Sequence, residues 1–115
     1  MGKIIAILRG IEPSQALSIG SVLLESGIHR IEVPLNSPEP FRSIELLVAE
    51  FGKDSLIGAG TVLNVASVRR LADIGAKIVV SPNSNGDVIR HTKKYGMISL
   101  PGVMTPGDCF TALEA

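Results

Sequence analysis

The sequence predicts an α/β fold with a parallel sheet, because short apolar runs alternate five times with longer helix-like runs. The apolar runs are nearly continuous, which is typical of parallel strands that are covered on both faces. Their starts are spaced by roughly 20–27 residues, about the length of one strand and one helix in a (β/α)8 barrel. We therefore predict that residues 1–115 are the N-terminal portion of a single TIM-barrel domain, with about five of its eight βα units.

An open doubly wound sheet also fits five units. The way in which the chain ends favours the barrel over this open sheet. The last helix-like run reaches Ala115 without a stop signal, and five parallel strands alone cannot close a barrel. We expect the chain to end inside a helix of a larger barrel. The predicted strands are residues 4–8, 31–35, 56–61, 78–80 and 97–100.

The segments between these strands carry helix signals. Pro13 lies in the first turn of the first predicted helix, Ser37 and Pro38 open the second, and Asn64 opens the third. The fourth helix is predicted around residues 87–95, and residues 105–108 are a capping-box start for the fifth. A glycine follows each of the first four helices, and we expect a left-handed conformation at each of them: Gly27, Gly52, Gly75 and Gly96.

Composition excludes several classes of protein. Eleven basic residues balance eleven acidic ones, and no basic cluster or aromatic platform is visible, so we expect no nucleic-acid partner. No run of 18 apolar residues is present, so we expect no membrane partner. Residues 1–9 lack the cleavage site of a signal peptide, and the lone Cys109 suits a reducing compartment, so we predict a cytoplasmic protein with Cys109 packed in a helix.

Nothing in the sequence points to a metal or a cofactor. His29 and His91 have no ligand spacing, and both are expected at the surface. The run Gly58-Ala59-Gly60 lacks the third glycine of a dinucleotide fingerprint and the acidic residue that should follow it. Residues 81–85 and 100–102 are interpreted as loops at the rim of the barrel, either lining a pocket or forming ordinary turns.

Three polar residues interrupt or end the apolar strands, namely Arg9, Glu32 and Thr61. The carboxyl ends of parallel strands carry the functional sites of α/β folds. Burial of Glu32 would raise its pKa toward neutrality, where a carboxyl group can take and give protons. A structural ion pair between Glu32 and Arg9 is the alternative. Arg9 could bind a carboxylate or phosphate or lie at the rim, and Thr61 could contact a ligand or cap its strand.

The ordered motifs of the chain resemble the 2-keto-3-deoxy-6-phosphogluconate/phosphogalactonate aldolases. The motifs are IAILRG (5–10), IEVPLNSP (31–38), IGAGTVL (57–63), VSPN (80–83) and LPG (100–102). Pro34 and Asn36 look like the phosphogalactonate branch, since the phosphogluconate branch usually has threonine and arginine there. The resemblance implies a trimeric (β/α)8 class I aldolase that splits a phosphorylated keto sugar acid into pyruvate and glyceraldehyde 3-phosphate.

By motif, the resemblance makes Glu32 the catalytic proton donor and acceptor, and Arg9 and Thr61 contacts to the substrate. In the family, a lysine on the sixth strand forms a Schiff base with the substrate. Since no lysine here follows a predicted strand, we expect the chain alone to be inactive; the lysines are Lys3, Lys53, Lys77, Lys93 and Lys94. Two alternatives stay open, a phosphogluconate aldolase and a non-catalytic five-stranded α/β binding module.

Overall fold

The computed structural model of the chain describes residues 3–115. Its five strands form one parallel sheet in the order β1-β2-β3-β4-β5, and a helix follows each strand. The elements are β1 (Ala6–Ile7), α1 (Pro13–Glu25), β2 (Arg30–Pro34), α2 (Pro40–Phe51), β3 (Leu56–Gly60), α3 (Val65–Ile74), β4 (Ile78–Ser81), α4 (Gly86–Lys94), β5 (Ile98–Pro101) and α5 (Pro106–Glu114). The predicted α/β class with five βα units is confirmed.

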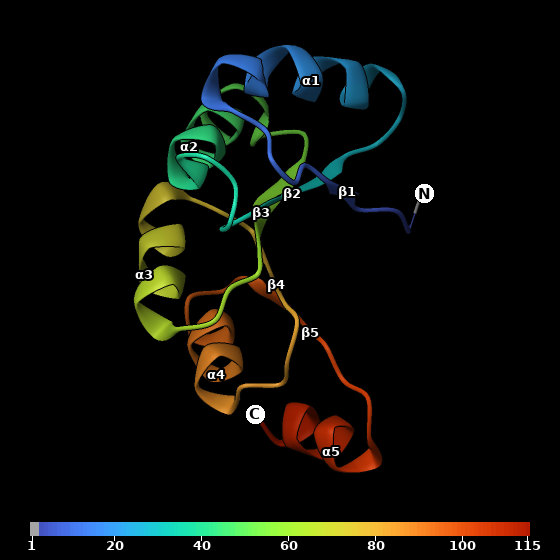
Figure 1. Cartoon of the computed structure of the whole chain (residues 1–115), viewed down its shortest axis with the longest axis vertical. Helices are drawn as coiled ribbons and strands as arrows, with labels where there is room; N and C mark the ends of the chain where they lie inside the picture. The colour runs from blue at the N-terminus through green and yellow to red at the C-terminus, as the bar shows by residue number, and fades with distance from the viewer. Residues whose placement is uncertain (1–2) are drawn as a thin grey trace.

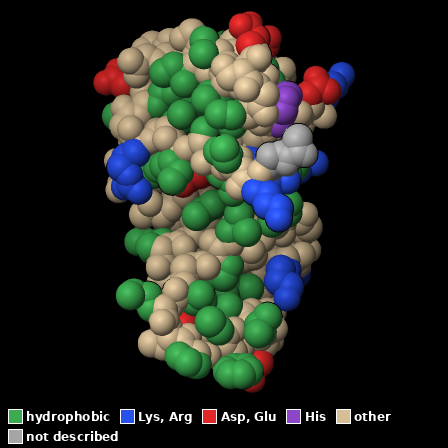
Figure 2. Space-filling view, turned by 90° about the vertical axis from the view of Figure 1, so that its right-hand side faces the viewer, with side chains coloured by type: hydrophobic (Ala, Val, Ile, Leu, Met, Phe, Trp, Pro, Cys, Tyr) green, Lys and Arg blue, Asp and Glu red, His purple; other side chains and the backbone are tan. Residues whose placement is uncertain are grey.

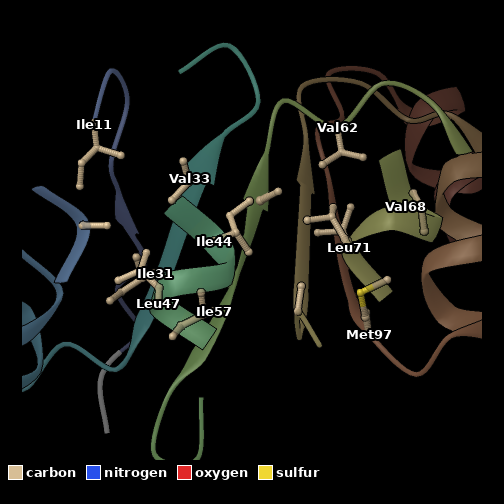
Figure 3. Close-up of a cluster of buried hydrophobic side chains, with 14 of the residues drawn as sticks. Ile11, Ile31, Val33, Ile44, Leu47, Ile57, Val62, Val68, Leu71 and Met97 are labelled. Atoms are coloured by element: carbon tan, nitrogen blue, oxygen red, sulfur yellow. The ribbon is translucent and has the colours of Figure 1, made fainter. Parts of the chain in front are cut away.

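Helices α1 to α4 lie along one side of the curved sheet, and α5 lies at its β5 end (Figure 1). Side chains alternate between the two faces of a strand, so alternate residues of β2 and β3 point toward the helices. Their apolar side chains pack with those of α2 and α3 in a dry core (Figure 3): Ile31, Val33, Ile57 and Ala59 from the strands, and Ile44, Leu47, Val68 and Leu71 from the helices. The same alternation sends Glu32 to the opposite face.

The opposite face of the sheet carries no helix, and apolar side chains gather on it (Figure 2). A cleft on this face is lined mainly by apolar residues of three strands and of the segment before β1, among them Ile5, Leu56, Ile78 and Ile98. At the two edges, Ile7 on β1 is 60% exposed and Ile98 on β5 is 45% exposed. The expectation of coverage on both faces is therefore wrong for β1 and β5. Apolar side chains are thus exposed at both edges of the sheet, as the edges of an unclosed barrel would leave them.

Several predicted boundaries need correction. β1 is shorter than predicted, since its ladder joins only Ala6 to Ile31 and Ile7 to Glu32. α2 begins at Pro40 rather than at Ser37 and Pro38. The amide of Ser37 donates to the carbonyl of Pro34 over 3.0 Å, and this turn delays the start of the helix.

Two side-chain or backbone expectations also fail. Gly27, Gly75 and Gly96 have the predicted left-handed φ, whereas Gly52 has a φ of −62°. The backbone at Gly52 instead lies close to that of Val48, and a Cβ at Gly52 would collide with the carbonyl oxygen of Val48. Cys109 is exposed rather than packed, since α5 buries none of its residues.

The capping predictions for α3 and α5 are confirmed. Asn64 accepts a hydrogen bond from the amide of Ser67, and Thr105 and Asp108 form the capping box of α5. Among the helices of residues 3–115, none has the length and apolar character needed to cross a membrane.

The tight approach of β3 to β4 at Gly58 yields a stability prediction. A Cβ at Gly58 would collide with the backbone carbonyl of Ile78 and lie 2.8 Å from its Cγ1. We expect Gly58→Ala to lower the free energy of unfolding by about 1–3 kcal/mol in urea titrations, as overpacking does. Gly107→Ala is the matched control, since the nearest atom to its Cβ would be Thr105 Oγ1 at 3.7 Å. Equal effects of the two substitutions would contradict the role of close strand approach.

Candidate active site

Glu32 is a buried carboxylic acid in the middle of β2, on the face of the sheet away from the helices. It is 3% exposed, and its Oε2 atom has no hydrogen-bond partner in residues 3–115. A glycine on the neighbouring strand makes room for it, because a Cβ at Gly60 would collide with the Glu32 carboxyl group. A buried polar atom without a partner costs free energy, so the site favours a ligand that can bond to Glu32.

Burial raises the pKa of Glu32 above its ordinary value, and the positive charge of Arg9 opposes this rise. The predicted direction of the shift is confirmed. Within the described residues, the structure has no ion pair between Glu32 and Arg9, so the structural ion pair is not formed. A raised pKa and an unpartnered oxygen are features of carboxyl groups that act in proton transfer.

Arg9 lies two residues after the end of β1 and is exposed. Its loop is tied to the loop after β2, since the amide of Gly10 donates to the buried Ser37 Oγ over 3.0 Å. The amide of Leu8 also donates to the carbonyl of Glu32, over 3.0 Å. These bonds hold Arg9 near Glu32 with its guanidinium free to contact an anionic ligand.

Thr61 follows β3 with a φ of 54°, a left-handed conformation that is rare for a β-branched residue. The chain on both sides of Thr61 is fixed. The carbonyl of Gly60 accepts from the amide of Leu35 over 2.9 Å, and the carbonyl of Val62 accepts from the buried Ser81 Oγ over 2.8 Å. Strained conformations held in this way are frequent at functional sites. The backbone of Thr61 is therefore consistent with a site residue.

β1, β2 and β3 are neighbours in the sheet. Glu32 lies on β2, and Arg9 and Thr61 follow the carboxyl ends of β1 and β3, so all three residues lie toward the same edge of the sheet. The sequence analysis did not recognise Ser37 and Gly60 as part of the site. Ser37 anchors the loop of Arg9, and Gly60 leaves space for the Glu32 carboxyl group. A signal for Gly60 existed, because a glycine in register two residues beyond the partner of Glu32 leaves space on the same face. The rim loops after β4 and β5 also line a cleft of about 380 Å³, with Asn83 and Gly102 among its residues.

The five lysines lie elsewhere. Lys3 and Lys77 precede β1 and β4, Lys53 precedes β3, and Lys93 and Lys94 are in the last turn of α4. None of them follows a strand, so none is placed beside Glu32. Within residues 3–115, no group of three potential metal ligands is found.

The raised pKa of Glu32 leads to a prediction about stability and pH. In the unfolded chain this carboxyl group titrates near 4.5, and in the fold it titrates higher. Wild-type stability should therefore fall as the pH rises from about 4.5 through the folded pKa, because ionisation disfavours the fold. Glu32→Gln removes this loss, so we expect it to be more stable than wild type at pH 7 and to lose this advantage in acid.

Urea unfolding at several pH values measures this difference, and Glu50→Gln, an exposed position on α2, is the control. If Glu32→Gln were destabilising by the same amount at every pH, the Glu32 carboxylate would be making favourable contacts in the fold.

Comparison with known proteins gives the family. The family model described as "Aldolase: KDPG and KHG aldolase" matches residues 1–115. A probable 2-dehydro-3-deoxy-6-phosphogalactonate aldolase of Rhizobium meliloti is 50% identical over 97% of this chain and 53% of its own length. The 2-dehydro-3-deoxy-6-phosphogalactonate aldolase of Escherichia coli K12 is 46% identical over 97% of this chain and 55% of its own length. The chain thus spans about half the length of the curated relatives it matches.

Solved structures agree in fold. A structure described as native KDPGal superimposes with a TM-score of 0.95 at 44% identity, covering 99% of this chain and 56% of that one. The 2-keto-3-deoxy-6-phosphogluconate aldolase of Zymomonas mobilis superimposes with a TM-score of 0.86 at 27% identity, covering 96% of this chain and 52% of that one. The five-stranded sheet is accordingly part of a TIM-barrel-type fold, and the chain belongs to the KDPG and KHG aldolase family.

Proposed function

We propose that residues 1–115 form the half of a class I aldolase that holds the acid–base residue and part of the substrate site. The whole protein would cleave 2-keto-3-deoxy-6-phosphogalactonate to pyruvate and glyceraldehyde 3-phosphate. The observation that carries the proposal is Glu32, a buried carboxyl group with an unpartnered oxygen and a raised pKa in a chain of this family. No other buried carboxyl group is present in residues 3–115.

The choice of phosphogalactonate over phosphogluconate rests on similarity and on one motif. The two relatives named as phosphogalactonate aldolases are 50% and 46% identical to this chain. The phosphogluconate aldolase of Treponema pallidum is 32% identical over 86% of this chain. Pro34 and Asn36, which follow Glu32 on the same strand and its loop, also fit the phosphogalactonate branch.

Each residue has a proposed role in the reaction. A lysine amine attacks the keto carbon of the substrate, and the resulting protonated Schiff base accepts electrons as the carbon–carbon bond breaks. Glu32 transfers protons during formation of the Schiff base and during bond cleavage, for which its raised pKa is suited. Arg9 contacts an anionic group of the substrate, and Thr61 contacts the carboxylate of the pyruvyl portion.

The Schiff-base lysine has no counterpart beside Glu32 in this chain, so we propose that residues 1–115 are inactive alone. The remaining half of the barrel would supply the lysine and the phosphate site and would cover the exposed apolar edges of β1 and β5. By the family resemblance, we also propose that the complete protein is a cytoplasmic homotrimer that needs no cofactor.

A chimera tests this function. Residues 1–115 are joined to the second half of the Escherichia coli relative, incubated with pyruvate and borohydride, and weighed by mass spectrometry. We expect one pyruvyl adduct on the chimera and none on residues 1–115 alone. We also expect faster cleavage of the phosphogalactonate than of the phosphogluconate substrate, and a loss in kcat of about 10²–10⁴ for Glu32→Gln.

Glu50→Gln, on the outer layer, is the control and should leave kcat unchanged. A stable adduct on residues 1–115 would contradict the inactivity proposal. A chimera that is folded but makes no adduct, together with residues 1–115 behaving as a folded monomer in size exclusion at several concentrations, would favour the non-catalytic binding module.

A further inference from the structure

A third cleft lies at the amino ends of the central strands, on the edge of the sheet opposite the candidate active site. Its volume is about 340 Å³, and three chain segments line it. These are the start of β2 with its preceding residue, residues 52–56 between α2 and β3, and Lys77 before β4. The backbone around it is fixed, since the amide of Leu56 donates to the carbonyl of His29 over 2.8 Å and that of Lys77 to Ile57 over 2.8 Å.

Positive charge gathers in this cleft although the chain as a whole is neutral. Arg30, Lys53 and Lys77 line it together with His29, and Asp54 is the one carboxylate among the lining residues. The described residues form two ion pairs, Arg42–Glu45 and Arg90–Asp87, and neither involves a residue of the cleft. Asp54 offsets one of the three cationic side chains, and the remaining positive charges repel one another, so an anion in the cleft would be held favourably.

A buried hydroxyl group points to the same kind of ligand. Ser55 is 7% exposed and lines the cleft, and its Oγ atom has no hydrogen-bond partner in residues 3–115. A buried hydroxyl without a partner is unfavourable. An anionic oxygen in the cleft would accept a hydrogen bond from this hydroxyl group, and charge-assisted bonds of this type are among the stronger ones in proteins.

We propose that this cleft, formed by Arg30, Lys53, Ser55 and Lys77, is a binding site for a phosphate group, either free or on a small ester. A phosphate dianion matches the excess of two positive charges over Asp54 in the cleft, and its oxygens can accept from the lysines and from Ser55 at the same time. The site is separate from the candidate active site, because its residues precede or begin the strands whereas Arg9 and Thr61 follow them.

Titration of residues 1–115 with inorganic phosphate and with glycerol 3-phosphate tests the proposal, with sodium chloride at matched ionic strength. We expect saturable binding by calorimetry and amide shifts in NMR spectra confined to residues 29–30, 52–56 and 77. Tighter binding of the ester would identify an organic phosphate as the ligand, and equal binding would identify free phosphate. Lys53→Ala and Lys77→Ala should each weaken binding about tenfold, as loss of a charge-assisted hydrogen bond does.

Two variants separate a ligand site from a structural role. Ser55→Ala should weaken phosphate binding without lowering the Tm of the unliganded chain, because its hydroxyl group has no partner in the fold. Lys94→Ala, which removes an exposed lysine outside the cleft, should leave binding unchanged. Absence of saturable binding, an equal response to chloride, or equal weakening by Lys94→Ala would overturn the proposal.

Discussion

The close parallel pairing of β2 with β3 and of β3 with β4 is the constraint on which the rest of the structure depends. It places Glu32 opposite Gly58 and puts Gly60 on the same face, so that no side chain occupies the space that the carboxyl group fills. The same approach presses Gly58 against the backbone of Ile78. A side chain at either glycine would separate the strands or expel the carboxyl group, so fold and candidate chemistry depend on the same backbone contacts.

The two faces of the sheet have different roles because of the strand period. On the helix side, Ile31, Val33, Ile57 and Ala59 complete a core that fixes the register. On the other side, the same strands present Glu32 and an apolar surface that extends to the exposed edges at Ile7 and Ile98. Stability is thus supplied by one face, which leaves the other free to hold a buried acid that is unfavourable for folding.

The fold class followed from the sequence because continuous apolar runs and helix punctuation are local signals. The caps at Asn64 and Thr105 were predictable for the same reason. The start of α2 was not, because Ser37 Oγ accepts from the amide of Gly10, 27 residues away in the sequence, and does not cap the helix. The prediction that Cys109 is packed was wrong, because α5 buries none of its residues against the other elements.

The candidate site was predictable in part. Arg9, Glu32 and Thr61 were found as polar residues in apolar strands, a pattern that is visible in one dimension. The space beside Gly60 could be anticipated only once the register of β2 against β3 was known. The anchor of Gly10 at Ser37 joins residues 27 positions apart, and no local sequence pattern displays it. The convergence of Lys53, Ser55 and Lys77 on one cleft is likewise a product of the fold.

The central claim is that β2 holds Glu32 as a buried acid without an ion-pair partner. The most direct test is a carbon-13 NMR titration of the glutamate carboxyl groups, with the Glu32 signal assigned by its loss in Glu32→Gln. We expect Glu32 to titrate above 4.5 and higher still in Arg9→Gln, because the charge of Arg9 lowers its pKa. Titration of Glu32 at or below 4.5 would show that β2 does not hold it as a buried acid with a raised pKa.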